Sequence, residues 1–573
     1  MTGARSELAQ VALLSRHFFG RLFRNETVDF EDQMKEKLFA VLALLAVFMA
    51  WSSWLLLFKY HFVADINRSW QEKAYVLTLM MLVFAVVTLL EWDVLFPDRQ
   101  DFLNLTPLPV RLRTVFAAKL VSFVLFVATF SAAMMSFSSL LFSLYLTQWR
   151  ADTVALGVRY VVAHLLAGFA ANFAVFFAVV FLQFALMAVL PGPAYKRISF
   201  VVRFALIAAL VFLLLSFIIA PSVLGGSFRA LESLKESGDP FVFRFPPLWF
   251  AGLYEFLLGT TDAVFLAQAR TAGLAMLLSL AAFGGAAALS YRRHVRKTLE
   301  ERKPRPPARG PAVAWRRLRD GVMLRSGEER AVYDFFTATL RASPRHRMSL
   351  VHYLAFSSAV VLVLVAANRV ALRGLSPRNG LLLVLPLLLA LGLIAGVRVL
   401  ADRPAALEAR WIFRLTETAR PERYVRGLKK AIVLRLLLPL FLAVFGFHAL
   451  FWGAGPAMAH ALFGFLVAAL VLEAAFYRYQ KVPFACPWVP GRFKPHYLFL
   501  PMSLGLLFGL AVLAAIEKAV LADPSRGAAL LAVAAAAALA LWAGNRRFYR
   551  SARLRFDDAP EAALIELRPE SDL

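Results

Sequence analysis

The chain has 573 residues, 60% of them hydrophobic, and this composition excludes an ordinary water-soluble domain because too much apolar surface would stay exposed. The formal net charge of +26 comes from basic residues that stand between apolar runs, a pattern typical of membrane topology, so we expect no nucleic-acid partner. The single cysteine, Cys486, excludes an internal disulfide and a multi-cysteine metal site.

Twelve apolar segments follow one another along the chain, each long enough or nearly so to cross the roughly 30 Å hydrocarbon core of a bilayer. The sequence therefore predicts an all-α polytopic membrane protein of about twelve transmembrane helices, arranged as two halves of six. The segments are 38–58, 74–90, 115–144, 160–190, 199–220, 271–290, 349–367, 380–399, 431–452, 457–477, 498–515 and 528–544.

The basic residues orient these spans. An even number of spans places both termini on one side of the membrane. If that side is the cytoplasm, the cytoplasmic segments hold roughly three times as many Lys and Arg residues as the external ones. We therefore predict cytoplasmic termini. The richness in Ala, Leu and Arg is typical of a bacterial protein, so we expect a multi-pass protein of the cell (inner) membrane.

An internal repeat organises the chain. Before each half stands an amphipathic stretch, "LAQVALLSRHFFGRLFR" and "AVYDFFTATLRASPRHR", in which apolar residues recur at helical spacing. Each half is therefore expected to begin with a helix on the cytoplasmic membrane surface. The expected parts are a cytoplasmic segment with the first such helix at 1–37, a six-span half at 38–290, a basic Pro- and Arg-rich linker at 291–328, the second amphipathic helix at 329–348, the second six-span half at 349–544 and a cytoplasmic tail at 545–573.

Two long cytoplasmic loops occupy equivalent places in the halves. The loop between the second and third spans lies in "EWDVLFPDRQDFLNLTPLPVRLRTVFAAKL", and the one between the eighth and ninth lies in "ADRPAALEARWIFRLTETARPERYVRGLKKAIV". Both contain Asp-Arg, then an aromatic residue and Leu-Thr, then Pro and basic residues up to the next span. A simple connection needs far fewer residues, so we predict that a partner contacts these loops.

The two halves differ on the external side. About 50 residues separate the fifth and sixth spans, and within them "PPLWFAGLYEFLLG" is too apolar for a free loop and too short to span, which predicts a re-entrant or interface-bound helix. The second half has only "IEKAVLADPSRG" at the equivalent place. We therefore expect no such helix there.

Charges inside the spans are few. Arg435 and Glu473 are expected at similar depth in the neighbouring ninth and tenth spans, so we predict an ion pair that acts as a structural clamp. His164, His352, His448 and His460 fall in different spans and are expected to be hydrogen-bonded packing residues rather than metal ligands. The shortage of intramembrane carboxylates favours a hydrophobic or amphipathic cargo over an ion.

The sequence contains no G-x-x-x-x-G-K-[ST] phosphate loop and no H-E-x-x-H zinc motif. We therefore predict no catalytic, cofactor-binding or metal-binding residues in this chain. If ATP drives its function, the ATP is bound by another polypeptide.

The plan of these elements resembles the permease of type-2 ABC exporters, here in a fused twelve-span form. In that family the loop between the second and third spans carries a coupling helix that docks on a cytoplasmic ATPase. The resemblance implies two coupling loops, and hence two ATPase copies, with the bilayer as the other partner. By position it implies docking through Asp98, Arg99, Asp101, Pro109, Arg111 and Arg113 in the first half and through Asp402, Arg403, Arg414, Pro421, Arg423 and Arg426 in the second.

Two other readings stay open. A secondary transporter of the major facilitator type also has six plus six spans and a basic central loop, but its loop between the second and third spans is short and Gly-containing, unlike "PDRQDF". A polytopic scaffold, whose loops dock something other than an ATPase, fits the same composition. A membrane glycosyltransferase is disfavoured, because the first external loop offers Asp65 and Glu72 rather than a close acidic pair.

Overall fold

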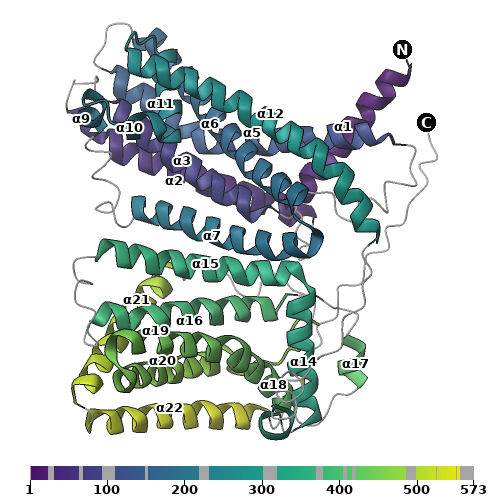
Figure 1. Ribbon diagram of the computed structural model, residues 1–573, viewed down its shortest axis with the longest axis vertical. Coiled ribbons are helices and arrows are strands. Elements are labelled where there is room, and N and C mark those ends of the chain that lie inside the picture. The colour runs from purple at the N-terminus through teal and green to yellow at the C-terminus, as the bar shows by residue number, and fades with distance from the viewer. Residues whose placement is uncertain are drawn as a thin grey trace. The chain divides into compact units, whose positions relative to one another are not determined.

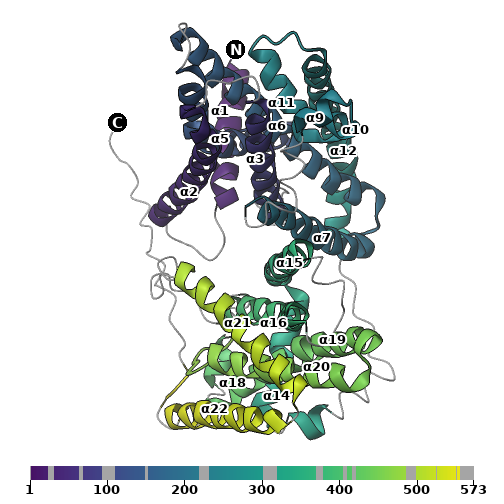
Figure 2. The same cartoon turned by 90° about the vertical axis from the view of Figure 1, so that its left-hand side faces the viewer.

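The computed structural model divides the chain into two units, 1–304 and 305–573, which are described one at a time (Figure 1 and Figure 2). Every regular element in its described part is a helix. The described residues are 2–23, 31–62, 69–92, 110–148, 153–218, 231–300, 319–324, 326–368, 379–403, 405, 410–415, 421–485, 499–523, 525–549 and 552–554.

Ten helices within the described residues are long and apolar enough to cross a membrane, which confirms an all-α multi-pass membrane protein. Two more long helices, α21 (Phe499–Ala522) and α22 (Ser525–Tyr549), lie where the eleventh and twelfth spans are predicted. The ten spans are Phe39–His61, Trp70–Leu90, Arg113–Thr147, Thr153–Val189, Arg197–Ile218, Ala263–Ala286, His346–Ala367, Gly380–Ala401, Glu422–Trp452 and Ala454–Ala475.

Unit 1 is a bundle built around one enclosed helix. About 78% of the α3 span is buried, against 44% or less for the other spans of this unit, so α3 is its central helix. The elements of unit 1 are α1 (Thr2–Phe23), α2 (Glu31–Leu57), η1 (Phe58–His61), α3 (Trp70–Leu90), α5 (Leu112–Thr147), α6 (Thr153–Val189), α7 (Gly192–Ile218), α9 (Leu231–Glu236), α10 (Pro240–Arg244), α11 (Pro246–Leu257) and α12 (Ala263–Glu300).

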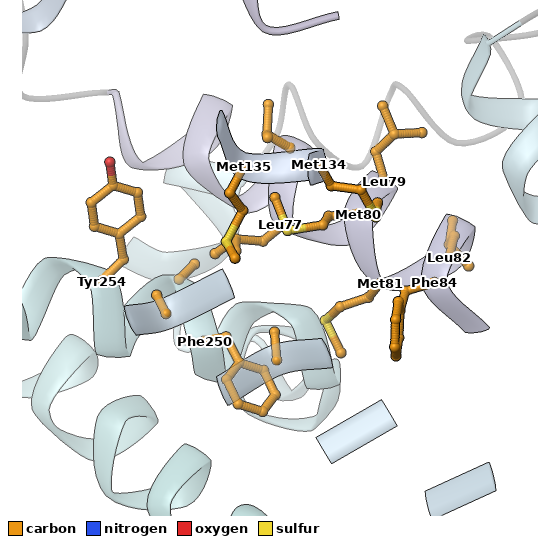
Figure 3. Close-up of a cluster of buried hydrophobic side chains, with 14 of the residues drawn as sticks. Leu77, Leu79, Met80, Met81, Leu82, Phe84, Met134, Met135, Phe250 and Tyr254 are labelled. Carbon is orange, nitrogen blue, oxygen red and sulfur yellow. The ribbon is translucent and has the colours of Figure 1, made fainter. Parts of the chain in front are cut away.

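Methionine side chains fill the space around α3. Met80 of α3 and Met134 and Met135 of α5 are fully buried and lie together in Figure 3. Gly168 of α6 lies so close to the Met135 sulfur that a Cβ at this position could not fit without moving the methionine. Flexible thioethers can fill the irregular gaps left between large helices, which suits a core in which aromatic and aliphatic side chains mix.

The segment "PPLWFAGLYEFLLG" between the fifth and sixth spans folds as a helix, α11, as predicted, and it is buried in unit 1. Its start carries Pro246 and Pro247, whose missing N–H groups cost nothing in a first turn. Leu248, Phe250 and Tyr254 are almost completely buried against α3, α6 and α12. The helix therefore closes one end of unit 1.

Unit 2 begins within the predicted linker. Helix α12 continues to Glu300, so the linker starts about ten residues later than its predicted start at 291. The second most enclosed span of the described set is α16, with 56% of its window buried. The elements of unit 2 are η2 (Arg319–Met323), α14 (Gly327–Ala342), α15 (Pro344–Ala367), α16 (Gly380–Ala401), α17 (Arg410–Leu415), α18 (Glu422–Ile432), η5 (Val433–Leu437), α19 (Leu438–Trp452), α20 (Ala454–Ala475), α21 and α22.

The same packing plan recurs in the two units. Within each, the second span, α3 or α16, is the most enclosed of the described spans. Within each, the leading amphipathic helix packs on the beginning of the third span: α1 on α5, and α14 on α18. The repeat that the loops predict from sequence therefore extends to which helices are neighbours.

Candidate docking site at the ends of the long loops

The leading helix of unit 2, α14, is shaped by its first turn and by one apolar face. The Ser326 hydroxyl accepts a hydrogen bond from the backbone N–H of Glu329 at 3.2 Å and so caps the helix. Val332, Tyr333 and Phe336 are fully buried on the other side. The helix runs across the ends of the long helices of unit 2 in Figure 1, as an interfacial helix should.

Helix α18 directly follows the second long loop and is equally two-sided. Tyr424, Val425 and Leu428 are buried, and they pack in one cluster with the apolar face of α14. The opposite positions carry Arg423, Arg426, Lys429 and Lys430. The end of the loop is thereby fixed to the leading helix by an apolar contact, and the basic residues are left for ion pairing.

Three ion pairs join α14 to α18, and we call them the α14–α18 clamp. Glu328 accepts from Arg423 at 2.9 Å, and Glu329 accepts from Lys430 at 2.6 Å and faces Arg426 at 3.6 Å. Glu329 is only 3% exposed, so losing its cations would leave a buried carboxylate unpaired. The Glu328–Arg423 pair is more open to water and contributes less.

The pKa of Glu328 is lowered, first by a backbone hydrogen bond at the helix start and then by hydrogen bonds from Arg423 and Ser326, which outweigh the cost of burial. A lowered carboxyl pKa means that the folded arrangement favours the charged form. The Glu328–Arg423 pair therefore requires an ionised carboxylate.

At Gly427 the backbone of α18 lies very close to the backbone of α14. A Cβ at this position would lie 2.5 Å from the backbone oxygen and 2.9 Å from the Cα of Glu329. Backbone atoms cannot move aside as a flexible side chain can, so only glycine allows α18 to lie this close to α14.

The end of the linker is fastened to the same helix. The Arg319 guanidinium donates to Asp320 at 2.6 Å and to Asp334 of α14 at 2.8 Å, and it lies 4.7 Å from the centre of the Tyr333 ring. Burial by itself would lower the pKa of Arg319, but the bonds and charges of the two aspartates raise it. Pulling on the linker would therefore pull on α14.

The predicted Arg435–Glu473 ion pair is not formed. Glu473 instead forms an ion pair with Lys429, whose Nζ donates a hydrogen bond to Glu473 Oε2 at 2.5 Å. The guanidinium of Arg435 lies 5.8 Å from the centre of the Tyr333 ring. Glu473 stands two residues before the end of α20, which places it level with the last turn of α18. Arg435 lies six residues after Lys429, in the π-helical turn η5, and is therefore further from that end of the span.

The short helix α17, within the second long loop, exposes apolar side chains. Trp411, Ile412 and Leu415 are 60%, 46% and 77% exposed, and we call them the α17 patch. Phe413 points the other way and is buried, with its ring 5.1 Å from Phe335 of α14. A six-residue helix held by one buried ring and showing three exposed apolar side chains is therefore a candidate docking feature.

Unit 1 repeats the arrangement with fewer contacts. Arg111, just before α5, donates to Glu7 of α1 at 2.5 Å. Leu14 and Phe18 of α1 pack against Ala118 of α5. Arg111 follows Pro109 at the same spacing as Arg423 follows Pro421. Equivalent arginines therefore bind a glutamate of the leading helix in both units.

The predicted docking residues divide into several groups. Asp98, Arg99, Asp101 and Pro109 lie outside the described residues. The predicted docking residues Arg111, Arg423 and Arg426 make ion pairs within their own unit, as does Asp402, which accepts from Arg398 at 2.5 Å.

The remaining residues of that prediction stand at the edges of the loops. Arg113 and Arg414 are exposed, at the start of α5 and on α17. Arg403 donates to the Ser349 hydroxyl at 3.5 Å, and Pro421 precedes the first turn of α18. The structure thus places Arg423 and Arg426 against α14, whereas Asp402 and Arg403 contact α16 and α15, so the second-half residues do not form one cluster.

Sequence reasoning missed the acidic members of the clamp. Glu7, Glu328 and Glu329 stand in the leading helices, which the sequence described only by their apolar faces. The available signal was the pair of acidic residues in the first turn of the second leading helix, opposite a loop that ends in basic residues.

Comparison of the chain with protein-family models, with curated proteins and with solved structures gives no match.

Proposed function

We propose that this chain is the transmembrane permease of an ATP-driven exporter of the type-2 ABC class, moving a hydrophobic or amphipathic substrate. The observation that carries the proposal is the recurrence, in both units, of a leading helix tied by a Glu–Arg pair to the segment that directly follows a long cytoplasmic loop. One docking arrangement per unit suits two copies of a separate ATPase. The cell membrane of a bacterium is the proposed location.

The contacts of α17 suggest how a docked protein would move unit 2. A partner that buries the α17 patch pushes on Phe413, whose ring contacts Phe335 of α14 and lies 6.3 Å from Tyr424 of α18. Helix α18 continues through η5 into α19 as the single span Glu422–Trp452. A displacement at the loop is therefore passed to a membrane-spanning helix and to the leading helix together.

The π-helical turn η5 is the weak point of that span. It interrupts the regular i to i−4 hydrogen bonding between α18 and α19, and such turns often mark functional positions in helices. We expect bending of the span to concentrate there. Because the sequence has no phosphate loop, the energy for that bending comes from ATP bound by the partner.

Purification of the full chain with its partner tests the docking claim. We expect a protein with a phosphate-binding loop to co-purify and to give ATP hydrolysis inhibited by vanadate. Joint replacement of Trp411→Ala and Leu415→Ala should remove that activity from the purified sample. The matched control is Val322→Ala, which truncates a similarly exposed apolar residue, 61% accessible, on η2 and should leave the activity in place.

Transport driven by different energy sources tests the rest. The chain and its partner ATPase are placed together in sealed vesicles. When ATP is supplied on the side of the membrane where the long loops lie, the vesicles should transport a lipophilic substrate, and without ATP they should not. Movement that follows an imposed proton gradient with no ATPase present contradicts the proposal and favours a secondary transporter. Stable copurification with a protein that hydrolyses no ATP contradicts it in favour of a scaffold.

A further inference from the structure

Three helices of unit 2 bring polar side chains together at the end of the bundle opposite the α14–α18 clamp. His460, in the second turn of α20, contacts Glu517, near the end of α21, with 2.5 Å between Nδ1 and Oε1. Each residue is only 1% exposed. The sequence suggested an external loop at Glu517, but α21 continues to Ala522 and carries this carboxylate into the packed bundle.

The surroundings of the pair are aromatic. The ring of His448, from α19, lies 4.8 Å from that of His460, and the Trp452 ring lies 4.2 Å from His448 and 5.4 Å from His460. The turn that allows this is Gly453, with φ of 77°, a conformation that other residues rarely adopt. It folds α20 back beside α19 and so brings the two histidine rings together in an edge-to-face contact, with 70° between their planes.

Two polar atoms of the pair have no partner. Glu517 Oε2 and His460 Nε2 are both buried and make no hydrogen bond. A buried carboxylate normally collects several donors, and this one has only the imidazole. The site is thus arranged around a single hydrogen bond between two groups that can each accept or release a proton.

The number of protons bound to the pair decides its net charge, and therefore which state the packed bundle favours. With a neutral imidazole and an ionised carboxylate, the pair carries a net charge of minus one. One further proton, on the imidazole Nε2 or on the carboxylate, makes the pair neutral overall. A net charge in hydrocarbon surroundings is costly, so the packed bundle favours the state with the additional proton.

We propose that His460 and Glu517 form a proton-binding site that holds α20 against α21 when one proton is bound and loosens that contact when the proton leaves. The leaving proton goes to water at this end of the bundle, and the bond between the imidazole and the carboxyl group remains as N–H···O⁻. A proton is a ligand that needs no cavity. Among the described residues no cluster of three ligating side chains is placed to hold a metal ion instead.

Few other titratable groups face this site. His448 is the nearest, and its Nδ1 lies 2.9 Å from the Val444 carbonyl oxygen. On the helices packed against α21, the charged residues Arg398, Glu473, Arg546 and Arg547 stand at the opposite ends of α16, α20 and α22, and Arg526 stands in the first turn of α22, at the near end. Lys518 adjoins Glu517 in sequence but is exposed, and Asp523 follows the end of α21. The pair therefore dominates proton binding in this part of unit 2.

Thermal unfolding of the full chain in detergent, followed between about pH 6 and pH 9, tests the proposal. The folded pair holds one more proton than the unfolded chain near neutral pH, so the wild-type stability should fall as the pH rises. Glu517→Gln keeps the size of the side chain but removes the carboxylate, so the folded pair no longer gains a proton and the fall in stability should disappear. His460→Gln leaves a buried carboxyl group that still takes up a proton, so it should keep the fall but shift it to another pH. The matched control His61→Gln, an exposed histidine of unit 1, should leave the wild-type profile unchanged.

Fluorescence of Trp452 gives a second readout, isolated as the difference between the wild type and Trp452→Phe. We expect this difference to titrate with the slope of a single proton, and to lose its pH dependence in Glu517→Gln. A pH profile that persists in Glu517→Gln overturns the proposal. If that variant does not fold, a Trp452 signal that is flat across the range overturns it by itself. Neither measurement needs the ATPase, so its outcome is independent of the proposed exporter.

Discussion

The two units end differently on the side away from their leading helices. In unit 1 the helices α9, α10 and α11 cover that end, and an ion pair joins α11 to α3: Lys73 Nζ contacts Glu255 Oε1 at 2.6 Å. In unit 2 no such helices stand among the described residues, and the His460–Glu517 pair lies toward that end of the bundle. One helical plan therefore supports two kinds of buried polar contact.

The two buried pairs differ because different side chains surround their charged groups. Lys73 is 2% exposed, but its ammonium lies 5.1 Å from the ring centres of both Tyr160 and Tyr254, so two aromatic faces and a carboxylate stabilise the cation. Glu517 has one imidazole and no fixed cation. A permanently charged pair needs the extra chain segment that α11 provides, whereas a pair that can become neutral does not.

The largest expected effect comes from removing one charge of the unit 1 pair. Glu255→Gln leaves the Lys73 ammonium buried without its anion, and we expect a loss of about 3–5 kcal/mol in the free energy of unfolding. Adding Lys73→Met should restore most of it. Thermal unfolding in detergent measures both. By contrast, Glu517→Gln in unit 2 should cost much less at low pH, and equal losses in the two units would remove the distinction between them.

The next effect concerns the approach of α14 to α18. Gly427→Ala forces the two backbones apart, and we expect a loss of about 1–3 kcal/mol, as for overpacking elsewhere. The control is Gly446→Ala, in α19, where a Cβ meets nothing within 4 Å and better helix propensity should leave stability unchanged or raised. Equal behaviour of the two variants would show that the close contact does not limit packing.

A smaller effect should separate the Glu–Arg pairs of the two units. Arg423→Glu places like charges beside Glu328 in a partly buried setting, and we expect a loss of about 0.5–1 kcal/mol that Glu328→Arg partly reverses. Arg111→Glu acts on a pair whose members are 79% and 46% exposed, so its effect should be nearer zero. A double-mutant cycle in each unit measures the coupling, and a stronger coupling in unit 1 would contradict this order.

The smallest expected effect is a loosening of α14 in acid. The pKa of Glu328 is lowered by folding, so its contribution to stability is present above the unfolded value of about 4.3 and is lost as the pH falls through the folded value. Hydrogen exchange of the α14 amides, read at several pH values below 5, should rise more in the wild type than in Glu328→Gln. Parallel curves would mean that this carboxylate does not hold the helix.

Much of the fold follows from local pattern. The leading helix of unit 2 was predicted at 329–348 and is found at Gly327–Ala342, because an apolar face is readable from a few residues. The helix at "PPLWFAGLYEFLLG" was predicted from its hydropathy and length in the same way. What pattern could not give was α11's burial, which depends on the space left between α3, α6 and α12.

The candidate sites show the same limit of what can be predicted from the sequence. Arg435 and Glu473 were paired from their expected depth, but Glu473 lies near the end of α20, level with Lys429 and not with Arg435, which stands six residues later. The basic residues of the second loop were predicted as a partner's contacts, yet Arg423 and Arg426 face Glu328 and Glu329. Depth and charge can be estimated from sequence, whereas partners cannot.

By itself the sequence determined that this is an all-α multi-pass membrane protein with two similar halves, because hydrophobic length and charge between spans are local properties that the bilayer selects. Only the tertiary structure decided which groups meet: Phe413 with Phe335, Gly427 with the backbone of Glu329, and His460 with Glu517. These residues are 57 or more positions apart, and their contact depends on how whole helices pack, which no single segment encodes.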